Sequence, residues 1–170
     1  MSPHSVGEAR KRVLEGLAKV TWFPPLFARV TLGVLFASTG WGKVHNLENV
    51  TAFFVDLGIP FPAFNAALVG WSELICGTLL LLGLLSRLAT IPLMVTMTVA
   101  LATALRSEIH NLPSLFGLVE LTYLVLLVFV AIGGPGALSI DAWIADRLEH
   151  PPHPREEPHA PVGRLSQHGA

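Results

Sequence analysis

Charged residues are scarce in this chain: Asp, Glu, Lys and Arg make only 14% of its 170 residues, whereas 52% are hydrophobic. A soluble domain usually carries roughly 25% charged residues. So few charges cannot solvate the surface of a chain this small, and we therefore expect lipid to cover part of it. The formal net charge of −1 also argues against nucleic acid as a partner, because nucleic-acid binding requires a basic surface.

Cysteine is nearly absent as well. The single cysteine, Cys76, excludes both an intramolecular disulfide and a Cys-x-x-Cys redox pair. We expect it to be a small core residue, because a lone thiol in an apolar helix is rarely ionised. The sequence shows no haem, flavin or iron–sulfur signature, so we expect no intrinsic cofactor. Electrons for any redox reaction would then come from a partner.

Long apolar stretches stand where the charges are missing. The chain holds 18 uncharged residues between Arg87 and Arg106, and 20 between Glu120 and Asp141. About 20 apolar residues are enough for a helix to cross a bilayer. We therefore predict an all-α fold, an integral membrane four-helix bundle. Its predicted spanning segments are residues 25–44, 63–85, 88–107 and 113–133.

The rest of the chain is assigned to shorter segments. We predict an N-terminal segment at 1–23, a membrane domain at 24–147 and a disordered tail, rich in proline and histidine, at 148–170. Short interfacial helices are expected at 13–23, within AFFVDLGIP (52–60) and within IDAWIADRL (140–148). Ser139 is expected to cap the last of these helices.

Lysine and arginine are concentrated on one side of the predicted membrane. Residues 44–62 and 108–112 contain neither, whereas both types occur before the first span and an arginine stands in the turn after the second. These basic residues are Arg10, Lys11, Arg12, Lys19 and Arg87. The positive-inside rule therefore predicts a multi-pass protein of the bacterial inner membrane with both termini in the cytoplasm.

A short pattern occurs twice along the chain. GWSEL (70–74) resembles GLVEL (117–121), and KVHNL (43–47) resembles EIHNL (108–112). In each half the order is helix, His-Asn-Leu, connection and then Gly-x-x-Glu-Leu. This order suggests two helical hairpins related as a parallel repeat.

The repeated pattern places one glutamate, Glu73 or Glu120, inside each of two apolar segments. A charge near the bilayer centre costs at least about 2.5–3.5 kcal/mol, so both acids should face the bundle interior. Glycines spaced at helical intervals indicate the inward faces. On the first span that face holds Arg29, Gly33, Phe36, Gly40 and Lys43; on the second it holds Gly70, Glu73 and Gly77.

These faces predict an inward cluster of polar residues at the non-cytoplasmic half. Its members are Lys43, His45, Glu73, Arg106, Glu108, His110 and Glu120. The repeat favours two ion pairs within it, Lys43–Glu73 and Arg106–Glu120. The pairs could lock the helices in register, bind a headgroup or move protons. A metal site of His45, His110 and the glutamates is a weaker alternative, because both histidines lie at loop edges.

Residues 26–143 resemble the DoxX family of small bacterial four-helix membrane proteins. The resemblance lies in the order of several short motifs. They are the first-span Arg29, the Gly-x-x-Lys that ends that span, LGIPFP, the Gly-x-x-Glu-Leu of the second span, LGLLSRLA and GGPGALSIDAW. By this resemblance Arg29, Lys43 and Glu73 match the polar positions of the family, whereas Glu120 follows only from the internal repeat.

The resemblance implies an accessory component of a membrane-associated, quinone-linked redox system, at most a subunit of an oxidoreductase. In this hypothesis Glu73 and Glu120 deliver protons. The quinone would be bound by Arg29, Lys43, Arg106, His45 and His110. The bilayer and a protein partner, an oxidoreductase or a maturation enzyme, are the expected partners. A non-enzymatic membrane scaffold and a small-molecule or proton carrier are the alternatives.

Overall fold

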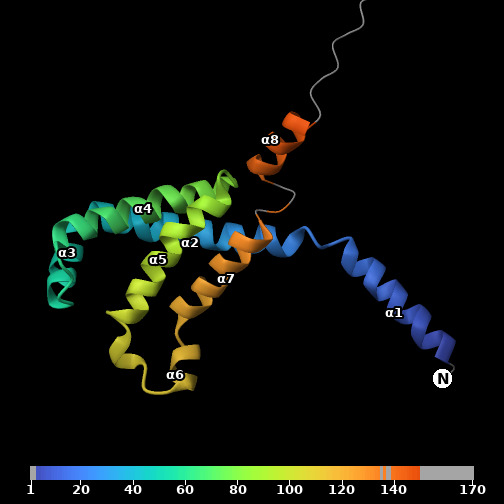
Figure 1. Cartoon of the computed structure of the whole chain (residues 1–170), viewed down its shortest axis with the longest axis horizontal. Helices are drawn as coiled ribbons and strands as arrows, with labels where there is room; N and C mark the ends of the chain where they lie inside the picture. The colour runs from blue at the N-terminus through green and yellow to red at the C-terminus, as the bar shows by residue number, and fades with distance from the viewer. Residues whose placement is uncertain (1–2, 135, 137–138, 150–170) are drawn as a thin grey trace, which may run out of the picture.

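The computed structural model describes residues 3–134, 136 and 139–149, and every regular element in these ranges is a helix (Figure 1). The elements are α1 (Pro3–Ala18), α2 (Phe23–His45), α3 (Leu47–Asp56), α4 (Pro62–Leu82), α5 (Ser86–Ala102), the 3-10 turn η1 (Arg106–Glu108), α6 (Leu112–Phe116), α7 (Val119–Gly133) and α8 (Ile140–Glu149). The all-α prediction is confirmed for this part of the chain. Most of the predicted tail lies outside the described residues.

The described helices differ in how well they fit a membrane by length and composition. α4, with 21 residues, is long and apolar enough to cross a bilayer by itself. The end of α1 and α2 pass the same test as a pair, with a bend of 44° between them. α5 and α7 are apolar but shorter, with 17 and 15 residues.

The fourth predicted segment, 113–133, is not one continuous helix. Asn111 and Ser114 form a reciprocal capping box that starts α6, and α6 ends at Phe116 after little more than one turn, with Gly117 as its C-cap. Leu118 is extended, with φ −75° and ψ 130°, and α7 begins only after it. The third segment also ends earlier than predicted, at Ala102 instead of residue 107.

The helices pack in two main pairs. α2 lies against α4, with α3 in the connection between them, and α5 lies against α7, with η1 and α6 in theirs (Figure 1). Contacts of α4 with α5 and of α2 with α7 join the two pairs. Each His-Asn-Leu motif begins the helix of a connection: Asn46 is the N-cap of α3 and Asn111 is the N-cap of α6, and the leucine that follows is the first helical residue.

Glycines bring α2 and α4 close together. A Cβ atom added to Gly33 would lie 2.7 Å from the backbone nitrogen of Leu81, and one added to Gly40 would overlap the backbone of Leu74. From α4, a Cβ added to Gly77 would overlap the backbone of Ala37. Small residues permit such backbone contact between apolar helices. The glycine faces predicted to point inward are therefore the packed faces.

Apolar side chains occupy both the interior and the outer faces of these helices. The core includes Leu32, Phe36, Leu80, Leu93, Leu127 and Val130, all nearly inaccessible. The outer faces expose Val34, Leu68, Ile75, Val95, Val125 and Ile132, among others. Such an exterior is unlike that of a soluble helical domain, whose outer faces are polar.

The N-terminal helix begins earlier than expected. α1 starts at Pro3, whereas the sequence predicted a helix only from residue 13. It extends away from the packed helices in Figure 1. Val13, Leu14 and Leu17 are exposed along it. At the other end of the chain, α8 follows Ser139, whose hydroxyl accepts a hydrogen bond from the Ala142 N–H at 3.0 Å, so the predicted cap is confirmed.

Candidate functional site: a buried lysine–glutamate pair

Lys43 of α2 and Glu73 of α4 form an ion pair. The Lys43 Nζ lies 2.5 Å from Glu73 Oε1, and the two side chains are 31% and 1% exposed. The pairing predicted from the repeat is therefore confirmed. The carboxylate is enclosed by protein, whereas the lysine side chain is partly exposed.

Thr39 completes the set of contacts to the carboxylate. Its hydroxyl donates a hydrogen bond to Glu73 Oε2 at 3.1 Å, so each carboxylate oxygen has one donor. The same hydroxyl lies 3.3 Å from the Phe36 carbonyl oxygen. Sequence reasoning missed Thr39. Its spacing of four residues before Lys43 places both on one side of α2, and this was the available signal.

Close helix packing positions this pair. Gly40 contacts the α4 backbone beside Glu73, and a Cβ on Gly70 would lie 3.4 Å from the Lys43 Cβ. Lys43 is thus level with Gly70, while the acid that it binds lies three residues farther along α4, or about 4.5 Å. A lysine near the end of a membrane helix commonly extends toward water. Here the lysine extends inward.

The acid is about halfway along its helix. Glu73 lies about 16 Å from the start of α4 at a rise of 1.5 Å per residue, and α4 is about 31 Å long. Removing either partner of a buried pair leaves an uncompensated charge, which is strongly destabilising. The two donors to Glu73 therefore hold a carboxylate at a depth where it could not otherwise remain charged.

The other polar residues of the predicted cluster do not join this pair. His45 is exposed on the side of α2; its ring lies 4.1 Å from the Trp41 ring, and its Nδ1 lies 2.9 Å from the Trp41 carbonyl oxygen. Arg106, Glu108 and His110 are exposed in the connection between α5 and α6. The single inward cluster predicted from the sequence is therefore wrong.

The predicted Arg106–Glu120 ion pair is also wrong, since no such contact occurs among the described residues. Because the chain breaks at Gly117 and Leu118, Glu120 lies in the first turn of α7 and is only half-buried. A carboxylate there interacts favourably with the positive end of the helix dipole. Although GWSEL resembles GLVEL, their glutamates therefore have different surroundings: Glu73 is enclosed in the middle of α4, whereas Glu120 is half-buried at the start of α7.

Arg29 lies at the opposite end of α2 from Lys43. Fourteen residues separate them, or about 21 Å along the helix, so they cannot share a site. Arg29 is buried, and its guanidinium packs against Gly83 in the turn between α4 and α5. Asp141 of α8 is near enough to interact electrostatically with it. Arg29 therefore belongs to the contact between α2, this turn and α8.

The candidate metal ligands do not come together in the described residues. Within the described ranges, no three His, Cys, Asp or Glu side chains lie close enough together to bind one. The alternative site of His45, His110 and the glutamates is thus not assembled.

Comparison with known proteins identifies the family. The DoxX family model matches residues 25–106. Over 130 residues the chain is 34% identical to the uncharacterised membrane protein Rv3486 of Mycobacterium tuberculosis. The alignment covers 70% of this chain and 80% of that protein. The chain belongs to the DoxX family. It is accordingly a membrane protein that associates with a lipid bilayer, which accounts for its apolar exterior.

Two further relatives come from Bacillus subtilis and Escherichia coli. The chain is 29% identical over 121 residues to the "Putative oxidoreductase CatD" of Bacillus subtilis, covering 70% of this chain and 85% of that protein. It is 32% identical over 117 residues to the inner membrane protein YqjF of Escherichia coli, covering 68% and 88%. No solved structure matches the chain.

Proposed function

We propose that this DoxX protein is a four-helix, multi-pass component of a quinone-linked redox system in the bacterial inner membrane. The ion pair of Lys43 and Glu73 is the observation that carries the proposal. A named oxidoreductase among the relatives is in line with it. The pair lies beside the exposed apolar side chains of α2 and α4. In this proposal these side chains contact the lipid in which a hydrophobic quinone dissolves.

The two residues would have different roles. Lys43 has three N–H donors and uses one on Glu73, so another can donate to a quinone carbonyl oxygen. Reduction of a quinone to a quinol consumes two electrons and two protons. In this proposal a partner oxidoreductase or maturation enzyme supplies the two electrons. The Glu73 carboxylate takes up a proton from the aqueous side and passes it to a reduced quinone oxygen, once for each of the two protons.

The proposed site is smaller than the sequence predicted. Lys43 and Glu73 remain in it, with Thr39 added as a donor to the carboxylate. Arg29, His45, Arg106, His110 and Glu120 lie elsewhere, and we do not include them.

Quinone content tests this proposal directly. The protein is purified in a mild detergent, and bound quinone is extracted and quantified by chromatography. We expect quinone to copurify with the unaltered chain and with Lys19→Gln, but to be depleted in Lys43→Gln. Equal quinone in the two lysine variants, with helix content preserved in both, contradicts the proposed site.

A second candidate is a membrane scaffold for a partner protein, in which the pair only fixes the register of α2 and α4. The observation that favours it is that both Glu73 oxygens already have donors inside the protein. Glu73→Gln discriminates between the candidates. A variant that keeps partner binding but loses quinone reduction supports the redox role. Unchanged quinone reduction supports the scaffold.

The four-helix arrangement is part of the proposal. α2 and α4 are long enough to span the bilayer, and we propose that α5 and α7 complete the bundle with η1 and α6 embedded in the opposite interface. The start of α2, the α4–α5 turn and α8 contact one another at one end. That end carries the basic residues Arg10, Lys11, Arg12, Lys19 and Arg87, so we place it and both termini in the cytoplasm.

A further inference from the structure

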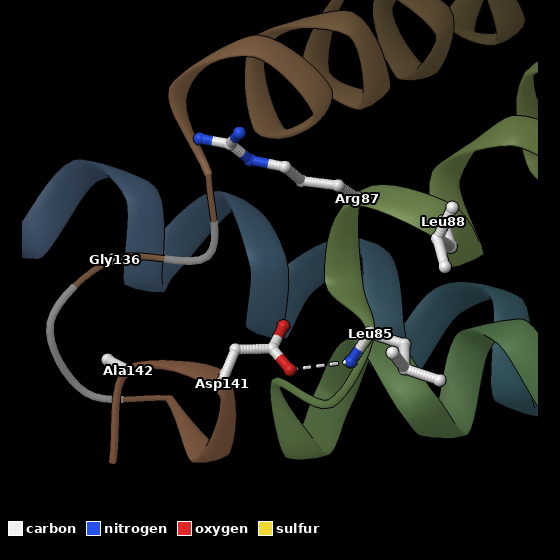
Figure 2. Close-up of a pocket in the computed structure, with 6 residues that line it drawn as sticks. All are labelled: Leu85, Arg87, Leu88, Gly136, Asp141 and Ala142. Carbon is white, nitrogen blue, oxygen red and sulfur yellow. Dashed lines mark hydrogen bonds between the residues drawn. The ribbon is translucent and has the colours of Figure 1, made fainter. Parts of the chain in front are cut away.

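An open pocket of about 410 Å³ lies at the end of the bundle that is remote from the lysine–glutamate pair. The turn between α4 and α5, Gly136 and the first turn of α8 surround it (Figure 2). It is lined by Leu85, Arg87, Leu88, Gly136, Asp141 and Ala142. None of the residues proposed to bind quinone contributes to it.

Two opposite charges face this pocket. The Arg87 guanidinium is exposed and has no hydrogen bond or ion pair with any residue that the structure describes. The Asp141 carboxylate lies on another side of the opening (Figure 2). Each of its oxygens accepts one backbone N–H, from Leu85 and from Ser86. About two of its four lone-pair positions are not used by these two bonds, and the buried Arg29 guanidinium lies near enough to interact with the carboxylate electrostatically.

An apolar stripe leads away from the pocket along α5. Its members are exposed and spaced by three or four residues, so they lie on one face of the helix. They are Leu88, Ile91, Val95 and Val99. From the first to the last the stripe extends about 16 Å at 1.5 Å per residue. A charged pocket that continues into such a stripe matches an amphiphile with a polar headgroup and a long hydrocarbon chain.

We propose that this pocket binds a phospholipid with a phosphoethanolamine headgroup. The phosphate binds Arg87, the ammonium group binds Asp141, and an acyl chain lies along the stripe of α5. Arginine is well suited to phosphate because its guanidinium presents several N–H donors in one plane. A glycerol headgroup has no cation that could pair with the Asp141 carboxylate. A choline headgroup would have no N–H to donate to it.

The proposal rests on the four-helix membrane arrangement proposed above but not on a redox role. Its test is therefore independent of quinone content. The full chain is purified, delipidated in detergent and mixed with equal amounts of phosphatidylethanolamine, phosphatidylglycerol and phosphatidylcholine. Native mass spectrometry then counts the bound lipids. We expect one phosphatidylethanolamine to be retained preferentially.

Three variants locate the site. Arg87→Gln should reduce phosphatidylethanolamine binding about tenfold, the effect of losing one charge-assisted hydrogen bond. Ala142→Leu should reduce it by filling the pocket while leaving both charges in place. Arg147→Gln is the matched control, because Arg147 is an exposed arginine of α8 that packs over the Trp143 ring, outside the pocket. It should bind like the unaltered chain.

Several results would overturn the proposal. One is equal retention of phosphatidylglycerol and phosphatidylethanolamine, since Asp141 would then have no effect on the headgroup. Another is an Arg87→Gln variant that binds no less lipid than Arg147→Gln. Soluble O-phosphoethanolamine binding as tightly as the diacyl lipid would show that the apolar stripe contributes nothing and that the occupant is not a lipid.

Discussion

Asp141 caps a helix that begins 55 residues before it in the chain. Its Oδ2 accepts a hydrogen bond from the Ser86 N–H at 2.9 Å, and its Oδ1 accepts one from the Leu85 N–H at 2.7 Å. The Asp141 N–H in turn donates to the Gly83 carbonyl oxygen at 3.0 Å. The first turn of α8 is thereby fastened to the turn between α4 and α5, against which Arg29 packs.

Replacing this cap should loosen one end of the bundle. Asp141→Ala is expected to lower the free energy of unfolding by about 1–2 kcal/mol, the usual effect of removing an N-cap. Hydrogen exchange of the Leu85 and Ser86 amides should accelerate, because their acceptors are gone. The control is Asp56→Ala, at the exposed end of α3. If these two amides exchange equally in both variants, the cap does not hold the turn.

Two glycines of α2 provide a matched pair for testing the contact with α4. A Cβ on Gly40 would overlap the Leu74 backbone, whereas one on Gly42 would meet nothing within 4 Å. Gly40→Ala should destabilise the protein by about 1–3 kcal/mol through overpacking. Gly42→Ala should be neutral or stabilise it by up to about 1 kcal/mol, because alanine favours the helix. Unfolding in mixed detergent micelles measures both. The same sign for both variants would contradict the packed face.

The spacing of small and charged residues predicted this part of the fold well. On α2, the steps of four and three from Arg29 through Gly33, Phe36 and Gly40 define the buried face, because helical periodicity is local. Pairing of Lys43 with Glu73 followed from the repeat and from the cost of an isolated charge in lipid. The helical spacing and the cost of a charge in lipid lead to the same arrangement here, so the sequence was sufficient to predict the packed face of α2 and its ion pair.

Other features depended on contacts that no local pattern shows. In the sequence, Asp141 is indistinguishable from any acidic residue in the first turn of a helix. Its role as a cap of α5 depends on the tertiary contact between α8 and the start of α5. Glu120 was misplaced because the apolar run around it suggested one continuous helix. The capping box of Asn111 and Ser114 and the extended Leu118 instead divide that run. Apolar composition alone does not reveal such a break.

The ion pair should respond differently to the loss of each partner. Lys43→Met leaves the enclosed Glu73 carboxylate without its cation, which typically costs about 3–5 kcal/mol. Glu73→Gln leaves the lysine unpaired, but its side chain is 31% exposed and can be hydrated, so we expect a smaller loss. The double variant should be more stable than Lys43→Met alone. Thermal unfolding of the unaltered chain, the two single variants and the double variant checks this order of stability. A Lys43→Met protein as stable as Glu73→Gln would contradict it.

Arg106 and Glu120 should show no energetic coupling. They form no ion pair within the described residues, so Arg106→Gln and Glu120→Gln should have additive effects within about 0.5 kcal/mol. Glu120→Gln alone should cost no more than about 1 kcal/mol, the loss of its interaction with the α7 dipole. A double-mutant cycle measures the coupling. A coupling above about 1 kcal/mol would restore the ion pair that the repeat predicted.

Labelling of single cysteines should establish the orientation of the bundle. In a Cys76→Ser background, the two exposed sites are Lys19→Cys before α2 and Asn49→Cys in α3. The 23 residues of α2 lie between them, more than the roughly 20 that a bilayer requires, so they should lie on opposite faces of the membrane. With both termini in the cytoplasm, a membrane-impermeant maleimide added to intact spheroplasts should label Asn49→Cys and not Lys19→Cys. Both should be labelled after the membrane is permeabilised. Labelling of Lys19→Cys in intact spheroplasts would place the basic end outside and reverse the proposed topology.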